Sequence, residues 1–148
     1  MISYYEMFPS LSDSDYAGLL EFRDALRRFL HWSEQLALAS GITPAQHQLL
    51  LAIRGHPTGP PTIGEVARHL LLRHHSVVGL VDRAEGVGLV ERRADSDDGR
   101  VVRLALTPLG VRRLDALAAA HVQEIEGLGS HLRPVWEALS APRAKLRR

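Results

Sequence analysis

The chain has 148 residues, of which 45% are hydrophobic, and its formal net charge is only +1. This length predicts one domain, or one domain with a helical extension, and the apolar content suffices for a buried core. Because cysteine is absent, disulfides are excluded. The sequence has neither an apolar run of roughly 18 residues nor a signal-peptide layout over residues 1–6. We therefore expect a cytoplasmic protein with no membrane partner.

The first predicted element is a long helix from Asp13 to Ala39. Apolar residues recur there at helical spacing, with a start signal at Ser12 or Ser14 and a stop signal at Gly41. Its apolar stripe is broad for one partner, so we expect this helix to pack on two surfaces.

Three shorter helices are predicted next. Capping boxes at Thr43 and Thr62 each begin a helix, and the first of these ends by Gly55. Residues 71–74 form a turn before a third helix over residues 75–87. Two short strands over residues 89–93 and 100–106 follow, and the Asp-Gly pair between them is a hairpin turn signal.

The C-terminal part is predicted to be helical again. Thr107 and Pro108 begin a helix, which we expect Gly127 and Gly129 to interrupt before a last short helix around residues 132–139 and a basic tail. The predicted fold class is therefore mainly α with a small β-wing.

A helix, a tight turn, a second helix and a two-stranded wing form an arrangement that reads duplex DNA. The N-terminal residues of the second helix reach base edges in the major groove, and a wing with arginines can follow the backbone. The residues we expect to contact DNA are Arg73, His74, His75, Ser76, Gly79, Arg92, Arg93, Arg100 and Arg103. A solvated helix start and a charged strand face are the alternative interpretations.

Three segments resemble the MarR family of transcriptional regulators. TIGEVARHL at 62–70 resembles the first helix of its reading unit, and SVVGLVDRAEGVGLVER at 76–92 resembles its recognition helix running into the wing. DSDDGR at 95–100 with LALTPLG at 104–110 is similar to its wing signature, which is the most specific of the three.

The resemblance implies an architecture and a function. It implies a winged helix-turn-helix over about residues 44–107, with dimerisation helices over 12–40 and 108–148, in a single MarR-like domain. It further implies a homodimer that binds double-stranded DNA at a near-palindromic operator as a repressor, released by a small-molecule effector.

The resemblance also implies residue roles, and the chain departs from the family pattern twice. Asp98 and Arg100 correspond to the residues that stabilise and present the wing. The family commonly has a basic residue where Gly99 stands and often has arginine where Gly79 stands, so a wing contact and a helix contact are missing here.

An effector pocket between the dimerisation helices and the reading unit is also implied. Phe29, Trp32, His47 and Leu51 are the candidate lining residues. Aromatic residues at helical spacing are more often part of a plain core.

Two other functional classes stay open. His69, His74 and His75 cluster in the sequence, and His121 with Glu124 has ligand spacing, so a metal-sensing regulator is one alternative. A winged-helix interaction module that does not bind DNA is the other. No CxxC or HExxH motif, nucleophile motif or glycine-rich phosphate loop occurs, so we expect no metal, no cofactor and no enzyme activity.

Overall fold

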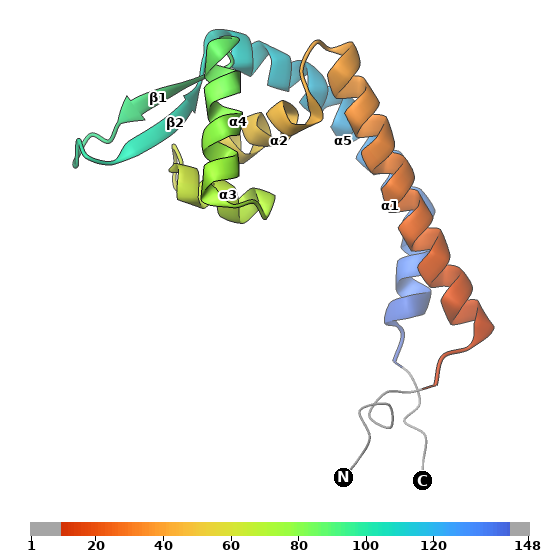
Figure 1. The fold of residues 1–148 in the computed structure, drawn as a ribbon. Helices are drawn as coiled ribbons and strands as arrows, with labels where there is room; N and C mark the ends of the chain where they lie inside the picture. Colours follow the sequence, from red (N-terminus) through yellow and green to blue (C-terminus); the bar gives the residue numbers. More distant parts are fainter. Residues whose placement is uncertain (1–9, 143–148) are drawn as a thin grey trace, which may run out of the picture. The chain divides into compact units, whose positions relative to one another are not determined.

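A computed structural model describes residues 10–142 of the chain. The elements, in chain order, are α1 (Asp13–Ala39), α2 (Pro44–Arg54), α3 (Ile63–Leu70), α4 (His74–Gly86), β1 (Val90–Ala94), β2 (Val102–Leu106) and α5 (Pro108–Ser140) (Figure 1). This mainly helical fold with one antiparallel hairpin confirms the predicted fold class. None of these helices is long and apolar enough to cross a membrane.

The chain divides into two compact units. The reading unit consists of residues 33–121, and the arm unit consists, within the described part, of residues 10–32 and 122–142. α1 and α5 each contribute one part to each unit, so the division falls within the two long helices.

The core of the reading unit is built from aliphatic side chains of α2, α3, α4, the hairpin and the first half of α5. Its largest fully buried members are Leu49, Leu50, Val66, Val77, Val81, Val90, Leu104 and Leu117. Full burial of each such side chain contributes about 1.5–3 kcal/mol. The β1–β2 hairpin projects from the cluster of α2, α3 and α4 (Figure 1).

Side-chain caps begin the short helices where the sequence predicts them. The Thr43 hydroxyl accepts from the backbone of Gln46 and the Gln46 side chain accepts from the backbone of Thr43. Thr62 and Glu65 form the same reciprocal pair. Two orphan amide donors are satisfied at each helix start, which explains why these boundaries were predictable.

The predicted interruption of the C-terminal helix is wrong. α5 runs without a break through Gly127, Gly129 and Pro134. Each glycine costs only about 1 kcal/mol in a helix, and packing along α1 offsets this cost. Contacts with α1 continue beyond the two glycines: the Phe22 and Trp136 rings lie 6.1 Å apart, and a Cβ on Gly18 would lie 3.4 Å from Leu139.

The hairpin connection also differs from the prediction. β2 begins at Val102 and pairs there with Ala94, so residues 95–101 form the connection. Gly99 has no left-handed backbone, because the positive-φ glycines lie elsewhere. The Asp95 carboxylate instead closes the loop by accepting from the amides of Asp97 and Asp98 at 3.1 and 3.0 Å. The turn is held by a side chain rather than by glycine geometry.

Candidate nucleic-acid interface

The start of α4 is open to solvent because the helix buries its opposite face. Its buried residues are Val77, Leu80, Val81 and Ala84, spaced three or four residues apart. Three of the predicted DNA contacts, Arg73, His74 and His75, are exposed at this end, and Ser76 is half-buried. Arg73 is the N-cap residue, but its side chain makes no capping hydrogen bond. The side chains at this end are therefore available to a ligand.

The outer face of α4 also carries Arg83, which was not among the DNA contacts predicted from the sequence. A Cβ built on Gly79 would lie 3.3 Å from Nη1 of Arg83, one helical turn further along. The missing side chain at Gly79 thus leaves room for this guanidinium. Arg73 and Arg83 have no ion-pair partner within residues 10–142. The helical spacing of Gly79 and Arg83 is the signal that could have identified it.

Arg92 connects the wing to α4. Its guanidinium donates to Asp82 and to Glu85, both at 2.7 Å, and its backbone N–H donates to Glu85 at 3.2 Å. The Asp82 hydrogen bond is the main cause that raises the pKa of Arg92. Arg92 was predicted to contact DNA, but here it holds β1 and neutralises two acids on the outer side of α4.

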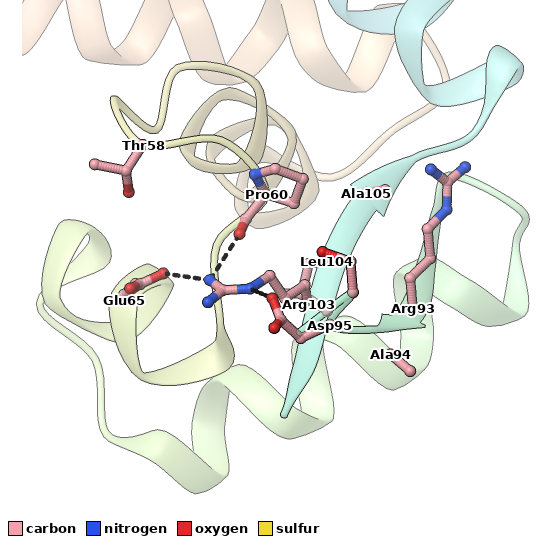
Figure 2. A pocket seen from close by; sticks show the side chains of 10 residues that line it. Thr58, Pro60, Glu65, Arg93, Ala94, Asp95, Arg103, Leu104 and Ala105 are labelled. Carbon is pink, nitrogen blue, oxygen red and sulfur yellow. Dashed lines mark hydrogen bonds and ion pairs between the residues drawn. The ribbon is translucent and has the colours of Figure 1, made fainter. Parts of the chain in front are cut away.

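Arg103 holds the other side of the wing (Figure 2). Its Nε donates to Asp95 at 2.5 Å, and Nη1 donates to the carbonyl of Pro60 at 3.1 Å and lies 3.8 Å from Glu65. The Arg103 hydrogen bond is the main cause that lowers the pKa of the Asp95 carboxyl, followed by the amides of Asp98 and Asp97. A cavity of about 490 Å³ lies beside this network, between the hairpin and the connector that follows α2.

The ion pairs further along the wing are more exposed. Arg100 donates to both carboxylate oxygens of Asp98 at 3.1 Å, which lowers the pKa of Asp98, although the Arg100 side chain is 91% exposed. Arg93 pairs with Glu91 and is 63% exposed. Water screens exposed pairs of this kind, so they contribute little to stability. Both arginines can therefore exchange their carboxylates for phosphates at little cost.

The sequence of the reading unit matches one known family. Residues 40–101 match the model described as MarR family. Over 79 residues the chain is 30% identical to the HTH-type transcriptional repressor MdtR of Bacillus subtilis (strain 168). The matched segment is 53% of this chain and 50% of MdtR, so the chain spans about half the length of this curated relative. The segment from the end of α1 to the hairpin connection is therefore similar in sequence to the MarR family.

Solved structures share the fold of this chain. MepR of Staphylococcus aureus, in a complex with DNA, superposes with a TM-score of 0.64 at 22% identity, over 74% of this chain and 78% of MepR. AbsC of Streptomyces coelicolor, a MarR family transcriptional regulator, gives a TM-score of 0.65 at 19% identity, over 89% of this chain and 98% of AbsC. At these identities the similarity establishes the fold.

The predicted effector residues fall into both units. In the arm unit the Phe29 and Trp32 rings lie 5.8 Å apart and line a cavity of about 420 Å³. In the reading unit His47 is buried and Leu51 is 54% exposed on α2. The shared effector pocket stays a prediction.

His47 packs on His121 inside the reading unit, with ring centroids 4.8 Å apart. Nδ1 of His121 lies 2.7 Å from the Leu117 carbonyl, which only accepts, so this nitrogen carries the proton. Nε2 of His121 forms a hydrogen bond with the Ser33 hydroxyl at 2.7 Å. Burial, and secondly His121, lower the pKa of His47. Burial therefore favours the neutral form of His47.

His69, His74 and His75, which are close in the sequence, do not come together in space as a metal site would require. Nε2 of His69 contacts His56 at 2.9 Å, whereas His74 and His75 lie at the start of α4. Across residues 10–142, no group of three or more histidine, cysteine or acidic side chains could hold a metal ion.

Proposed function

We propose that this protein is a DNA-binding transcriptional regulator that inserts α4 into the major groove of duplex DNA. The observation that carries the proposal is the start of α4, which presents Arg73, His74 and His75 without any nearby acid on the same segment. No Asp or Glu occurs between Glu65 and Asp82. The name of the relative MdtR, a transcriptional repressor, and the MepR–DNA complex support this function.

The near-neutral net charge is compatible with this function because most acids of the reading unit are already paired. Asp82 and Glu85 are bound by Arg92, and Asp95 is bound by Arg103. A phosphate backbone approaching α4 therefore meets Arg73 and Arg83 rather than unpaired carboxylates. The distribution of charge, not its total, favours nucleic-acid binding.

We further propose that two copies act together through their arm units. The arm unit exposes large apolar side chains that a second copy would cover: Leu19, Leu20, Leu30, Val122, Ile125 and Trp136. Two reading units would then face successive major grooves roughly 34 Å apart. The operator is therefore expected to be nearly palindromic. Repression, and release by a small-molecule effector, complete the proposal.

Selection of bound duplexes from a random pool tests the proposal. We expect enrichment of a near-palindrome whose half-sites lie about 10–10.5 base pairs apart, and an affinity that falls steeply with salt. Failure to enrich any duplex would contradict DNA binding and favour a protein-interaction module. Sedimentation at micromolar concentration tests the pairing, and a clean monomer would contradict it.

A matched pair of variants locates the interface. His75→Ala at the start of α4 should change the enriched sequence, because α4 start residues face base edges. Arg112→Ala, an exposed arginine on α5, is the control and should leave the enriched sequence unchanged. An unchanged profile for His75→Ala would remove this residue from the interface.

A further inference from the structure

The turn between α3 and α4 holds an unusual leucine. Leu71 ends α3 with φ 54° and ψ 39°, the left-handed conformation, and it is the sole non-glycine residue with positive φ in the part of the chain described. Its side chain is 91% exposed. The backbone of the turn is well defined, since the amide of Leu72 donates to the Ala67 carbonyl at 3.0 Å.

Position 71 favours glycine for two reasons: the backbone is left-handed, and an apolar side chain there is exposed to water. A Cβ in the left-handed region crowds the following carbonyl, so helix ends of this kind usually carry glycine. A single exposed leucine is unremarkable alone. At Leu71, however, an exposed apolar side chain coincides with a strained backbone, and neither gives a packing benefit within the chain. A contact outside the chain would account for both.

The surroundings of Leu71 indicate what that contact is. Arg68 precedes it on α3, Arg73 and His74 follow it, and the nearest acids along the chain are Glu65 and Asp82. All of these flanking basic side chains are exposed. A protein partner would need a strongly acidic surface here, whereas duplex DNA supplies both negative charge and apolar methyl groups.

We propose that Leu71 is a specificity-determining residue that packs on the 5-methyl group of a thymine in the major groove. This inference rests on the proposed DNA-binding function. Leu71 lies two residues before the cap of α4, so α4 would carry it to the wall of the groove that the helix enters. Thymine is the one base with a methyl group on that edge, so an apolar contact there discriminates sequence without a hydrogen bond.

Replacing thymine by deoxyuridine removes only the methyl group and tests the contact directly. In the duplex selected by the wild-type protein, each thymine is replaced in turn, and binding is measured for wild type and Leu71→Gly. We expect one position in each half-site where deoxyuridine weakens wild-type binding about 5- to 10-fold, which is the size of a small apolar contact. Leu71→Gly should bind the original duplex similarly weakly and show no further loss at that position.

Thermal stability separates this role from a structural one. Leu71→Gly removes the left-handed strain, so its midpoint temperature should equal or exceed that of wild type while its affinity falls. Leu71→Asn, which tolerates the same backbone, should show the same loss of affinity. Leu38→Ala, which changes an exposed leucine on α1, is the control and should bind as wild type.

The outcomes distinguish this inference from the function on which it rests. If wild type binds no duplex, the proposed function fails. If wild type binds and Leu71→Gly binds equally well with the same deoxyuridine profile, the Leu71 contact alone is overturned, and a protein-facing role for the turn takes its place.

Discussion

The base of the wing and the outer face of α4 both carry arginines, but in the part of the chain that the structure describes only the arginines at the wing form ion pairs with acidic side chains. Arg92 and Arg103 each bind two acidic side chains, and Arg103 also binds a backbone carbonyl. Arg73 and Arg83 have no acidic partner within residues 10–142. The arginines around α4 therefore divide into those that acidic side chains of the chain hold in place and those that are available to a ligand.

The division follows from the cost of moving each guanidinium. An arginine held by several partners must give them all up before it binds phosphate, and it leaves their charges unpaired. An arginine without a partner gives up only water. We therefore expect Arg73 and Arg83 to contact the backbone, and Arg92 and Arg103 to act through the positions and charges that they control.

The strongest test of this comparison is Arg92→Ala. The substitution leaves Asp82 and Glu85 unpaired on the side of α4 that we propose faces DNA, so we expect a roughly 30- to 100-fold loss of affinity at low salt. Fluorescence anisotropy with the selected duplex measures this loss.

Removing the charges of Asp82 and Glu85 in the Arg92→Ala variant tests how Arg92 acts. If Arg92 works by neutralising the two acids, Asp82→Asn with Glu85→Gln should recover most of the affinity of Arg92→Ala. Should these changes recover nothing, Arg92 contacts DNA itself, and the division between building and contacting arginines fails at this position.

A smaller effect is expected for Arg83→Ala. Loss of one phosphate contact should weaken binding to all duplexes by about 10-fold and lower the slope of log affinity against log salt by about 1. Arg112→Ala on α5 provides the matched exposed arginine. A loss confined to one sequence would mean that Arg83 reads a base instead.

The parts of the fold that the sequence predicted are those governed by neighbouring residues. Thr43 and Thr62 begin helices through partners three residues away, and the apolar spacing of α4 depends only on its own turns. The continuity of α5 was missed because it depends on α1, from which Phe22 packs against Trp136. Local glycine propensity does not contain that information.

The candidate site was predictable in position but not in the roles of its members. Arg103 contacts Pro60, 43 positions earlier in the chain, and such a contact exists only after the hairpin docks. Sequence placed Arg92 beside the wing but could not indicate that two carboxylates of α4 bind it. Arg83 could have been identified, because its spacing of four residues from Gly79 places both on one face of α4.

The histidines include one that is buried within the chain and others that are exposed. His47 is buried with its pKa lowered from 6.5, first by burial and then by His121, whereas His74 is exposed. His47 binds a proton more readily in the unfolded chain than in the folded one. The contribution of neutral His47 to the free energy of unfolding is therefore fully present above pH 6.5 and declines as the pH falls below 6.5. We expect the midpoint temperature to fall by a few degrees between about pH 7.5 and 5.5. His47→Phe should flatten this dependence and His74→Gln should not; equal slopes in both variants would assign the effect to other groups.

The smallest expected effect concerns Gly79, where stability and binding should change in opposite directions. Gly79→Ala adds helix propensity worth about 0.5–1 kcal/mol, so the free energy of unfolding should rise. The new Cβ would lie 3.3 Å from Nη1 of Arg83, and the flexible guanidinium must shift to make room. If Arg83 contacts phosphate from its present position, affinity should fall by about 2- to 3-fold. The same substitution in an Arg83→Ala background should leave affinity unchanged, because the displaced group is then absent. An equal loss in both backgrounds would mean that the backbone of Gly79, rather than the neighbouring arginine, approaches the DNA.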